Sequence, residues 1–268
     1  MRSDAAEALE GLSATSPYRT TMLHTQGLAA LIDGDLDEAD ASFAHAYDLA
    51  VSIETSPVAA LVLTEQFLVA VERDEWTVAG SLIKRSLEIV TRGPFEGYWT
   101  SALVYAAAAH AAVHRGSLPE ARHYLTKATE LRPLLTYALP VVSVQALLEI
   151  ARTHLALMEP DGMREVLDQV RGILQQRPHL GTLVTATHEL EERVSHLSNA
   201  APFAASSLTP AELRLVPLLP TRMTMAEIGE TLFLSRNTVK TQAISIYRKL
   251  GVSSRNEAVE RLVELGLV

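Results

Sequence analysis

A spacing of large and small apolar residues that returns four times is the feature that most constrains how this chain folds. In the two clearest copies, a turn at Gly34 or Gly116 is followed at fixed offsets by a large apolar residue, an Ala, a large apolar residue and a second Ala. Looser copies follow Asp74 and Asp161. Offsets of three and four residues place side chains on one face of a helix. The sequence therefore predicts helices that bury a repeated face.

The position after the first large apolar residue is held by Ala39, Ala79, Ala121 and, in the loosest copy, Val166. The copies therefore lie 40, 42 and 45 residues apart. This arrangement resembles the second helix of the tetratricopeptide repeat, whose usual period is about 34 residues. In such a repeat the small residue lets two helices approach closely, and the large residues fill the space to the next pair. The resemblance implies four helical hairpins in a curved array, with longer helices or a divergent repeat.

Helical spacing extends to about Asn199, with no sustained alternation of the kind that strands show. Small and polar residues then replace the amphipathic pattern, which is typical of a linker. We therefore predict an all-α protein with a helical repeat domain at residues 1–199, a linker at residues 200–207 and a second domain at residues 208–268.

Composition favours a soluble, folded protein of a reducing compartment. Apolar residues make up 48% and charged residues 21% of the chain, which is ordinary for globular proteins. The chain has no Cys, so disulfides, zinc knuckles and a Cys nucleophile are excluded. Neither a signal peptide nor an uninterrupted apolar run of about 18 residues is apparent. We expect a cytoplasmic protein that does not contact a membrane.

Charge is distributed unevenly along the chain. The net charge is −9, yet residues 208–268 carry +2 and the remainder −11. Residues 235–250 contain Arg236, Lys240, Arg248 and Lys249 and no acid. A local basic patch matters more for nucleic-acid binding than the total charge does.

Four helix starts are marked within residues 208–268. Three of them carry the capping-box pattern of a Ser or Thr with a Glu three residues later: Thr209 with Glu212, Thr224 with Glu227, and Ser254 with Glu257. Ser235 and Gly251 mark the two ends of the remaining helix, which follows a turn short enough for a helix-turn-helix. Because Pro217 and Pro220 interrupt the first of the four helices, we predict that it is short or kinked.

The helix that begins near Arg236 has two chemically distinct faces. Val239, Ala243, Ile246 and Leu250 share a face that is expected to pack inward. The opposite face presents cationic and amide side chains, which suit the phosphates and base edges of a DNA major groove.

Residues 235–241 (SRNTVKT) and 246–255 (IYRKLGVSSR) resemble the LuxR-type, or GerE-like, helix-turn-helix. Residues 208–213 (LTPAEL) and 226–229 (AEIG) match the same family at the right distances. The resemblance implies a transcriptional regulator that binds double-stranded DNA as a homodimer. Its implied DNA-binding residues are Arg236, Asn237, Thr238, Lys240, Thr241, Ile244, Arg248 and Lys249, with Lys240 and Thr241 nearest the bases and Thr238 and Lys249 near phosphates. Its implied dimer contacts are Ala258, Val259, Leu262 and Val263.

Repeats followed by this module resemble the C-terminal part of the large ATP-binding LuxR regulators. No Gly-Lys-Ser/Thr loop for ATP is present, so we expect no cofactor. Gln242 stands where this family more often has His, which is expected to alter the packing or reach of the groove helix. The expected partners are DNA, a second copy of the chain, RNA polymerase, and a protein or small-molecule effector at the repeats.

Two groups of side chains admit more than one interpretation. Phe95, Tyr98, Trp99 and Tyr105 either line an effector groove or fill the core between hairpins, and core filling is the commoner outcome. His110 and His114 lie four residues apart, but no Glu accompanies them and no third ligand is apparent, so we expect packing or surface histidines and no metal.

The acids at Asp35, Asp37, Glu38 and Asp40 lack the spacing of a Ca²⁺ loop and are typical of a helix start.

No nucleophile, base and orienting group are recognisable together, so we expect no enzyme. An alternative function is an interaction scaffold whose helix-turn-helix serves as a dimerisation module, which the two prolines and the acidic N-terminal region favour.

Overall fold

The computed structural model describes the whole chain except residues 1, 14–15, 55, 158, 205–207 and 233. Within the described residues all regular structure is helical and no strand occurs, so the all-α prediction is confirmed. The chain divides into two compact units, residues 1–190 and 191–268. Among the described residues, no helix has the length and apolar character needed to cross a membrane.

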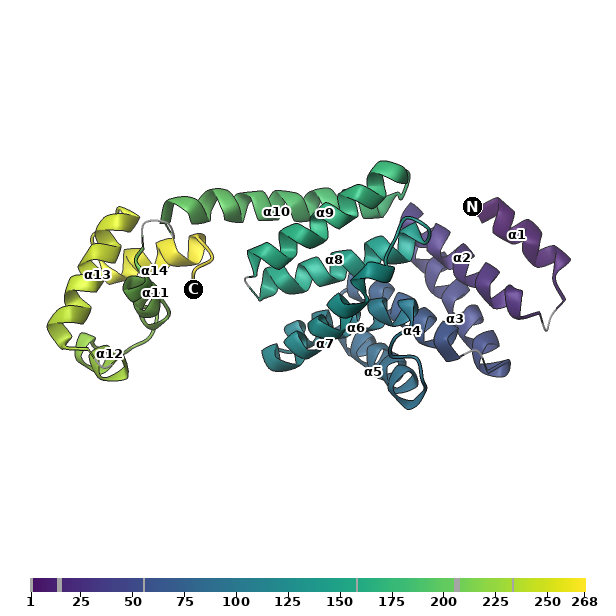
Figure 1. Ribbon diagram of the computed structural model, residues 1–268, viewed down its shortest axis with the longest axis horizontal. Helices are drawn as coiled ribbons and strands as arrows, with labels where there is room; N and C mark the ends of the chain where they lie inside the picture. The colour runs from purple at the N-terminus through teal and green to yellow at the C-terminus, as the bar shows by residue number, and fades with distance from the viewer. Residues whose placement is uncertain (1, 14–15, 55, 158, 205–207, 233) are drawn as a thin grey trace. The chain divides into compact units, whose positions relative to one another are not determined.

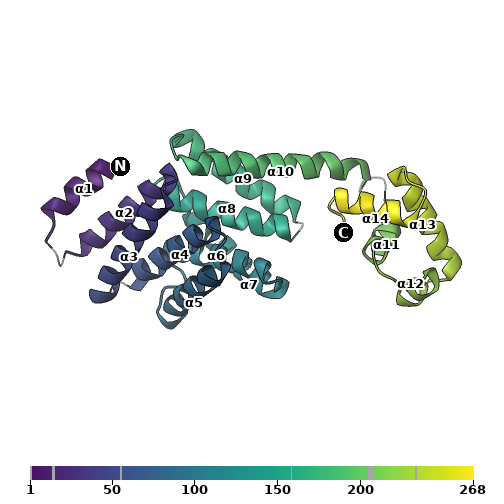
Figure 2. The same ribbon diagram turned by 180° about the vertical axis from the view of Figure 1, so that it is seen from behind.

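The first unit is built of helical hairpins. Its helices are α1 (Arg2–Gly11), α2 (Pro17–Asp33), α3 (Leu36–Ser52), α4 (Ser56–Glu72), α5 (Trp76–Arg92), α6 (Trp99–His114), α7 (Leu118–Leu131), the 3₁₀ turn η1 (Arg132–Leu134), α8 (Pro140–Ala156), α9 (Pro160–Gln176) and the start of α10 (Thr182–Ala204). Helices α2 and α3, α4 and α5, α6 and α7, and α8 and α9 pack in pairs, and α4, α6 and α8 join one pair to the next (Figures 1 and 2). These are the four predicted hairpins.

The repeated positions form the interior of this array. Ala39, Ala79, Ala121 and Val166 are fully buried on α3, α5, α7 and α9. Close helix packing explains why small residues are needed: a Cβ on Gly27 of α2 would lie 2.4 Å from the ring of Phe43 on α3. The predicted buried face is confirmed.

A left-handed residue follows the first helix in three of the hairpins, after α2, α4 and α6. Gly34 and Gly116 have φ of 85° and 74°, a conformation that glycine adopts without steric cost. Asp74 holds the corresponding place in a looser copy with φ of 58°. Asp tolerates this region better than most residues. The looser copy therefore keeps the turn without its glycine.

Helix α10 runs through part of the predicted linker. It continues to Ala204, so residues 200–204 are helical, and residues 205–207 lie outside the described residues. The segment is rich in Ala, which has the highest helix propensity, and this explains a helix that continues after its amphipathic pattern ends. The division between the compact units falls inside α10, and the predicted domain limits stay a prediction.

The second unit contains four short helices after α10. They are α11 (Pro210–Leu215), followed by the 3₁₀ turn η2 (Val216–Leu218), α12 (Met225–Leu232), α13 (Arg236–Leu250) and α14 (Arg255–Glu264). Their core is formed by Leu208, Leu215, Val216, Leu219, Ile228, Val239, Ala243, Ile246 and Leu262. The prediction of a short first helix is confirmed, because α11 gives way to η2 next to Pro217.

Candidate nucleic-acid interface

Leu234, just before α13, lies against Gly229 of α12. The N–H of Leu234 donates to the carbonyl of Gly229 at 2.8 Å. A Cβ on Gly229 would lie 2.6 Å from the Leu234 carbonyl oxygen, so this position needs glycine for close approach. Ser235 caps α13 by accepting the N–H of Thr238 at 3.1 Å, and Gly251 ends the helix with φ of 70°. The predicted ends of this helix are confirmed.

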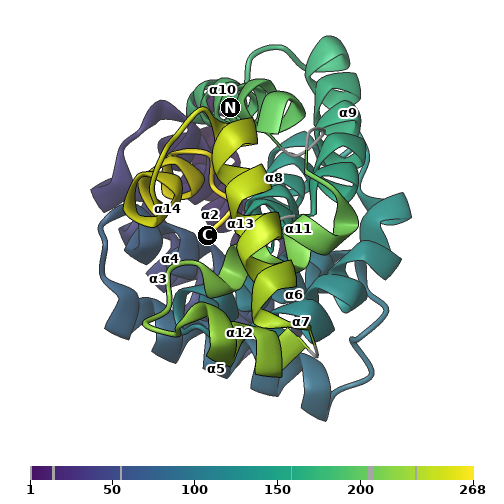
Figure 3. The same cartoon turned by 90° about the vertical axis from the view of Figure 1, so that its left-hand side faces the viewer.

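Helix α13 packs against α11, α12 and α14 of its own unit (Figure 3). Val239, Ala243 and Ile246 are buried in the core of the unit. The residues exposed on α13 are Arg236, Asn237, Thr238, Lys240, Thr241, Ile244 and Arg248. Gln242 is half-buried at the side of the helix. Among the described residues, no carboxylate forms an ion pair with Arg236, Lys240 or Arg248, which leaves these cations available to phosphates.

Two of the exposed hydroxyls already take part in the helix. Thr238 Oγ1 lies 2.8 Å from Ser235 Oγ, within the cap of α13. Thr241 Oγ1 donates to the carbonyl of Asn237 at 2.9 Å. Both hydroxyl oxygens keep lone pairs with which to accept a further hydrogen bond. Contact of either hydroxyl with DNA stays a prediction.

Lys249 lies apart from the other basic residues of α13. Its Nζ donates to Glu212 Oε2 on α11 at 2.6 Å, and its side chain is only 22% exposed. The same Glu212 oxygen accepts the N–H of Thr209 at 2.5 Å, which completes the predicted capping box. Burial raises the pKa of Glu212, but hydrogen bonds from Lys249, Thr209 and Ser245 outweigh burial and lower it to about 2. Lys249 therefore ties α13 to α11, and its expected phosphate contact would require breaking this ion pair.

The expected dimer residues on α14 divide between the core and the surface. Ala258 and Leu262 are fully buried, and Leu262 belongs to the core of its own unit. Val259 is half-buried against that core, whereas Val263 is 59% exposed. Because both side chains are buried within their own unit, contact of Ala258 or Leu262 with a partner stays a prediction.

Comparison with known proteins agrees with this geometry. Residues 206–262 match the family described as bacterial regulatory proteins, luxR family. The C-terminal module is a LuxR-family helix-turn-helix domain. The chain is also similar to the transcriptional regulatory protein LiaR of Bacillus subtilis (strain 168), with 34% identity over 120 residues, which is 44% of this chain. This chain spans about half of LiaR, 52% of its length.

Outside the LuxR-family domain, the four aromatic residues considered for an effector groove do not line one surface. Tyr105 is 1% exposed, within the core of the array, where Lys127 Nζ lies 5.1 Å from its ring centroid. Phe95 and Tyr98 meet edge to face at 5.5 Å in the turn before α6, and Tyr98 is 48% exposed. Hairpin packing covers the ring of Tyr105, which favours core filling for this residue, and an effector groove at these residues stays a prediction. Trp99 is half-buried at the start of α6.

Neither candidate histidine belongs to a metal site among the described residues. His114 stacks on Trp76 with ring centroids 3.6 Å apart. His110 Nδ1 lies 2.5 Å from Glu149 Oε2, and Glu149 is almost fully buried. The buried contact of Glu149 with His110 was not predicted from the sequence, although a charged residue within the apolar stretch 140–156 indicates such a partner.

The acids near Asp35 form a helix start, as predicted. Asp35 caps α3 by accepting the N–H of Glu38 at 3.1 Å. Arg73, in the turn after α4, pairs with Asp37 and, at 3.5 Å, with Asp40.

Proposed function

We propose that this protein is a transcriptional regulator that binds a specific double-stranded DNA sequence as a homodimer and responds to an effector at its helical array. The observation that carries the proposal is the face of α13, where Arg236, Lys240 and Arg248 are exposed, close together along one helix and unpaired with acids among the described residues. In helix-turn-helix proteins the second helix of the motif lies in the major groove. Helix α13 holds that place in the LuxR-family domain.

As a homodimer, the protein would bind a DNA site made of two half-sites. Two-fold related domains read two half-sites about one helical turn of DNA apart. Val263 is the exposed apolar side chain of α14 and is our candidate for the centre of the dimer contact. We include RNA polymerase among the proposed partners because a regulator acts on transcription through it.

The alternative of a scaffold without DNA binding loses part of its motivation. Pro217 was one reason for it, and the structure accommodates this proline by the change from α11 to the 3₁₀ turn η2. The framework around α13 keeps its core and its caps. A DNA-binding module therefore remains the better reading of this unit.

Selection of bound genomic fragments, followed by titration of the best fragment, tests the proposal. The double variant R236A/K240A should bind that fragment at least roughly tenfold more weakly, since a good base contact contributes about 1–3 kcal/mol. Its affinity should also depend less on salt, because fewer counterions are released.

A matched control is K84A/R177A, which removes two exposed positive charges from the first unit. Its affinity should stay within about twofold of the parent protein. Equal losses in the two double variants would show that total charge, rather than α13, drives binding. Absence of DNA retention at low salt would refute the proposal and favour the scaffold.

A further inference from the structure

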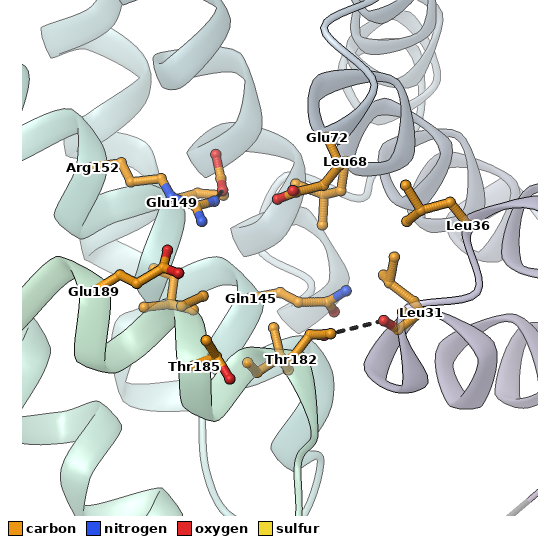
Figure 4. A pocket seen from close by; sticks show the side chains of 14 residues that line it. Leu31, Leu36, Leu68, Glu72, Gln145, Glu149, Arg152, Thr182, Thr185 and Glu189 are labelled. Atoms are coloured by element: carbon orange, nitrogen blue, oxygen red, sulfur yellow. Dashed lines mark hydrogen bonds and ion pairs between the residues drawn. The ribbon is translucent and has the colours of Figure 1, made fainter.

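A cavity of about 370 Å³ lies within the first unit, where the start of α10 meets the first hairpin. Thr182 Oγ1 of α10 donates to the carbonyl of Leu31 on α2 at 3.1 Å (Figure 4). Gly181, with φ of 52°, lets this contact form, because a Cβ there would lie 1.9 Å from the Ile32 carbonyl oxygen. Contact between residues about 150 positions apart in the chain therefore forms one side of the cavity. Its walls come from α2, α3, α4, α8 and α10.

Arg152, the arginine among the lining residues, already forms an ion pair with Glu149. Arg152 donates through Nη1 to Glu149 Oε1, and His110 holds the other oxygen of the same carboxylate. Glu72 and Glu189 also line the cavity and are exposed to solvent. The lining thus holds three carboxylates and one arginine. Arg152 forms its ion pair with Glu149 and also interacts electrostatically with Glu72 and Glu189, but neither of these two carboxylates forms an ion pair among the described residues. This charge balance favours a cationic ligand over an anionic one.

Gln145 adds a buried acceptor that lacks a donor. The residue is 3% exposed, and its Nε2 donates to Glu65 Oε2 at 2.7 Å. In this contact the amide nitrogen of Gln145 faces Glu65, and Oε1 is the other polar atom of the amide. No group in the described part of the chain donates to Gln145 Oε1. Figure 4 shows the side chain reaching between Glu149 and Leu31 into the space that the cavity occupies. A buried unpaired acceptor is costly, so this atom calls for a donor.

The rest of the lining is apolar. It consists mainly of Leu31, Leu36, Leu68, Leu148 and Leu183. Pockets of this kind bind the body of a ligand through apolar contacts and orient it through a few polar groups.

We infer that this cavity binds a small molecule with a protonated amine on an apolar body. The amine donates to Gln145 Oε1, and the carboxylates of Glu72 and Glu189 balance its charge. The leucines enclose the apolar body.

The role of this molecule as effector rests on the proposed function. Helix α10 supplies Thr185 and Glu189 to the cavity and continues to Ala204, toward the LuxR-family domain in sequence. A ligand that contacts α10 therefore touches the element that joins the two parts of the chain.

Calorimetric titration of the full chain with hexylamine, hexanol and hexanoate tests the binding site. Hexylamine should bind saturably, hexanol at least roughly tenfold more weakly, and hexanoate not detectably, because only the amine supplies a charged donor. The variant E72Q/E189Q should weaken hexylamine binding about tenfold. Should that variant not fold, E189Q alone, at an exposed helix position, should weaken binding in the same direction.

The matched control is E130Q/E192Q, which removes two exposed carboxylates outside the cavity. It should leave hexylamine binding unchanged within about twofold. The inference is overturned if hexylamine fails to bind, if hexanoate binds equally well, or if both double variants lose affinity alike. Binding of hexylamine by a chain that retains no DNA would uphold the site and refute the proposed function. DNA binding by a chain that does not bind hexylamine would refute the amine site and leave the proposed DNA-binding function standing.

Discussion

At the scale of single residues, Arg255 is the side chain on which the loop before α12 depends. Its guanidinium donates to the carbonyls of Leu219 at 2.8 Å, Met223 at 2.7 Å, Thr221 at 2.8 Å and Leu218 at 3.2 Å. Leu218 is the last residue of the 3₁₀ turn η2, and the other three carbonyls follow it before α12 begins. The Leu218 carbonyl also accepts the N–H of Thr221 at 3.3 Å and its Oγ1 at 2.7 Å. One side chain of α14 thus donates hydrogen bonds to four carbonyls of the proline-containing segment.

The variant R255A should destabilise the LuxR-family domain by roughly 3 kcal/mol, because hydrogen bonds from a charged group contribute about 1.5–3 kcal/mol and several carbonyls lose their donor. Hydrogen exchange of peptides from residues 208–268 measures this loss directly. Trp76 and Trp99 both belong to the first unit, so their fluorescence transition in urea is an internal control that should not move. Unchanged exchange in residues 218–223 would show that Arg255 is dispensable.

At the scale of elements, α11 and α13 are joined by one ion pair whose strength depends on pH. The pKa of Glu212 is lowered to about 2, so its ionised form is favoured in the folded domain. The ordinary pKa of Glu is about 4.3, and a shift of one unit corresponds to about 1.4 kcal/mol. The stabilisation is therefore complete above about pH 5 and is lost as pH falls toward 2.

The variant E212Q should destabilise the domain by roughly 2 kcal/mol at pH 7 and by progressively less as the pH falls below about 4. Hydrogen exchange of residues 208–250 at pH 3 and pH 7, corrected for intrinsic rates, measures the difference. E230Q, on the exposed surface of α12, is the matched control and should show no such dependence. A deficit of equal size at both pH values would mean that Glu212 acts through its shape rather than its charge.

Local sequence patterns predicted where helices begin and end, but they did not predict contacts between residues far apart in the chain. The cap at Ser235 and the capping box of Thr209 involve neighbours in sequence, so residue types at fixed spacing were sufficient. The contact of Gln145 with Glu65 joins residues 80 positions apart, and no spacing indicates it. Apolar periodicity also does not distinguish a core from an interface. Leu262, which the family resemblance assigned to the dimer contact, lies in the core of its own unit.

At the scale of the whole molecule, the division of charge was readable from the sequence, whereas the cavity was not. Residues 1–207 carry a net −11, and no ligand site was predicted from this acidity. Part of it, at Glu72, Glu149 and Glu189, lines one cavity because α4, α8 and α10 converge there. Such convergence follows from how the hairpins stack, and the sequence contains the stacking residues without giving the angle between successive pairs.

The last prediction concerns how the two parts of the chain communicate. On the proposed functions, hexylamine at the cavity changes the affinity of the chain for its DNA fragment, and coupling of this kind typically amounts to about 1–3 kcal/mol, or 5-fold to 150-fold. Helix α10 contributes to the cavity and continues toward the LuxR-family domain in sequence, so we expect it to connect the two binding sites. Two glycines inserted after Asn199 weaken a helix by about 1 kcal/mol each. The insertion should abolish the effect of hexylamine on DNA affinity.

Each binding event taken alone is the control for this experiment. Hexylamine binding by calorimetry and DNA binding without hexylamine should both stay within about twofold of the parent chain, because the insertion lies outside the cavity and outside α13. Two alanines inserted at the same point keep helix propensity high while shifting the helix register, so they separate continuity from phase. Coupling that survives the glycines but not the alanines would mean that α10 sets the rotation of the domain rather than transmitting order. Coupling that survives both would mean that α10 carries no signal at all.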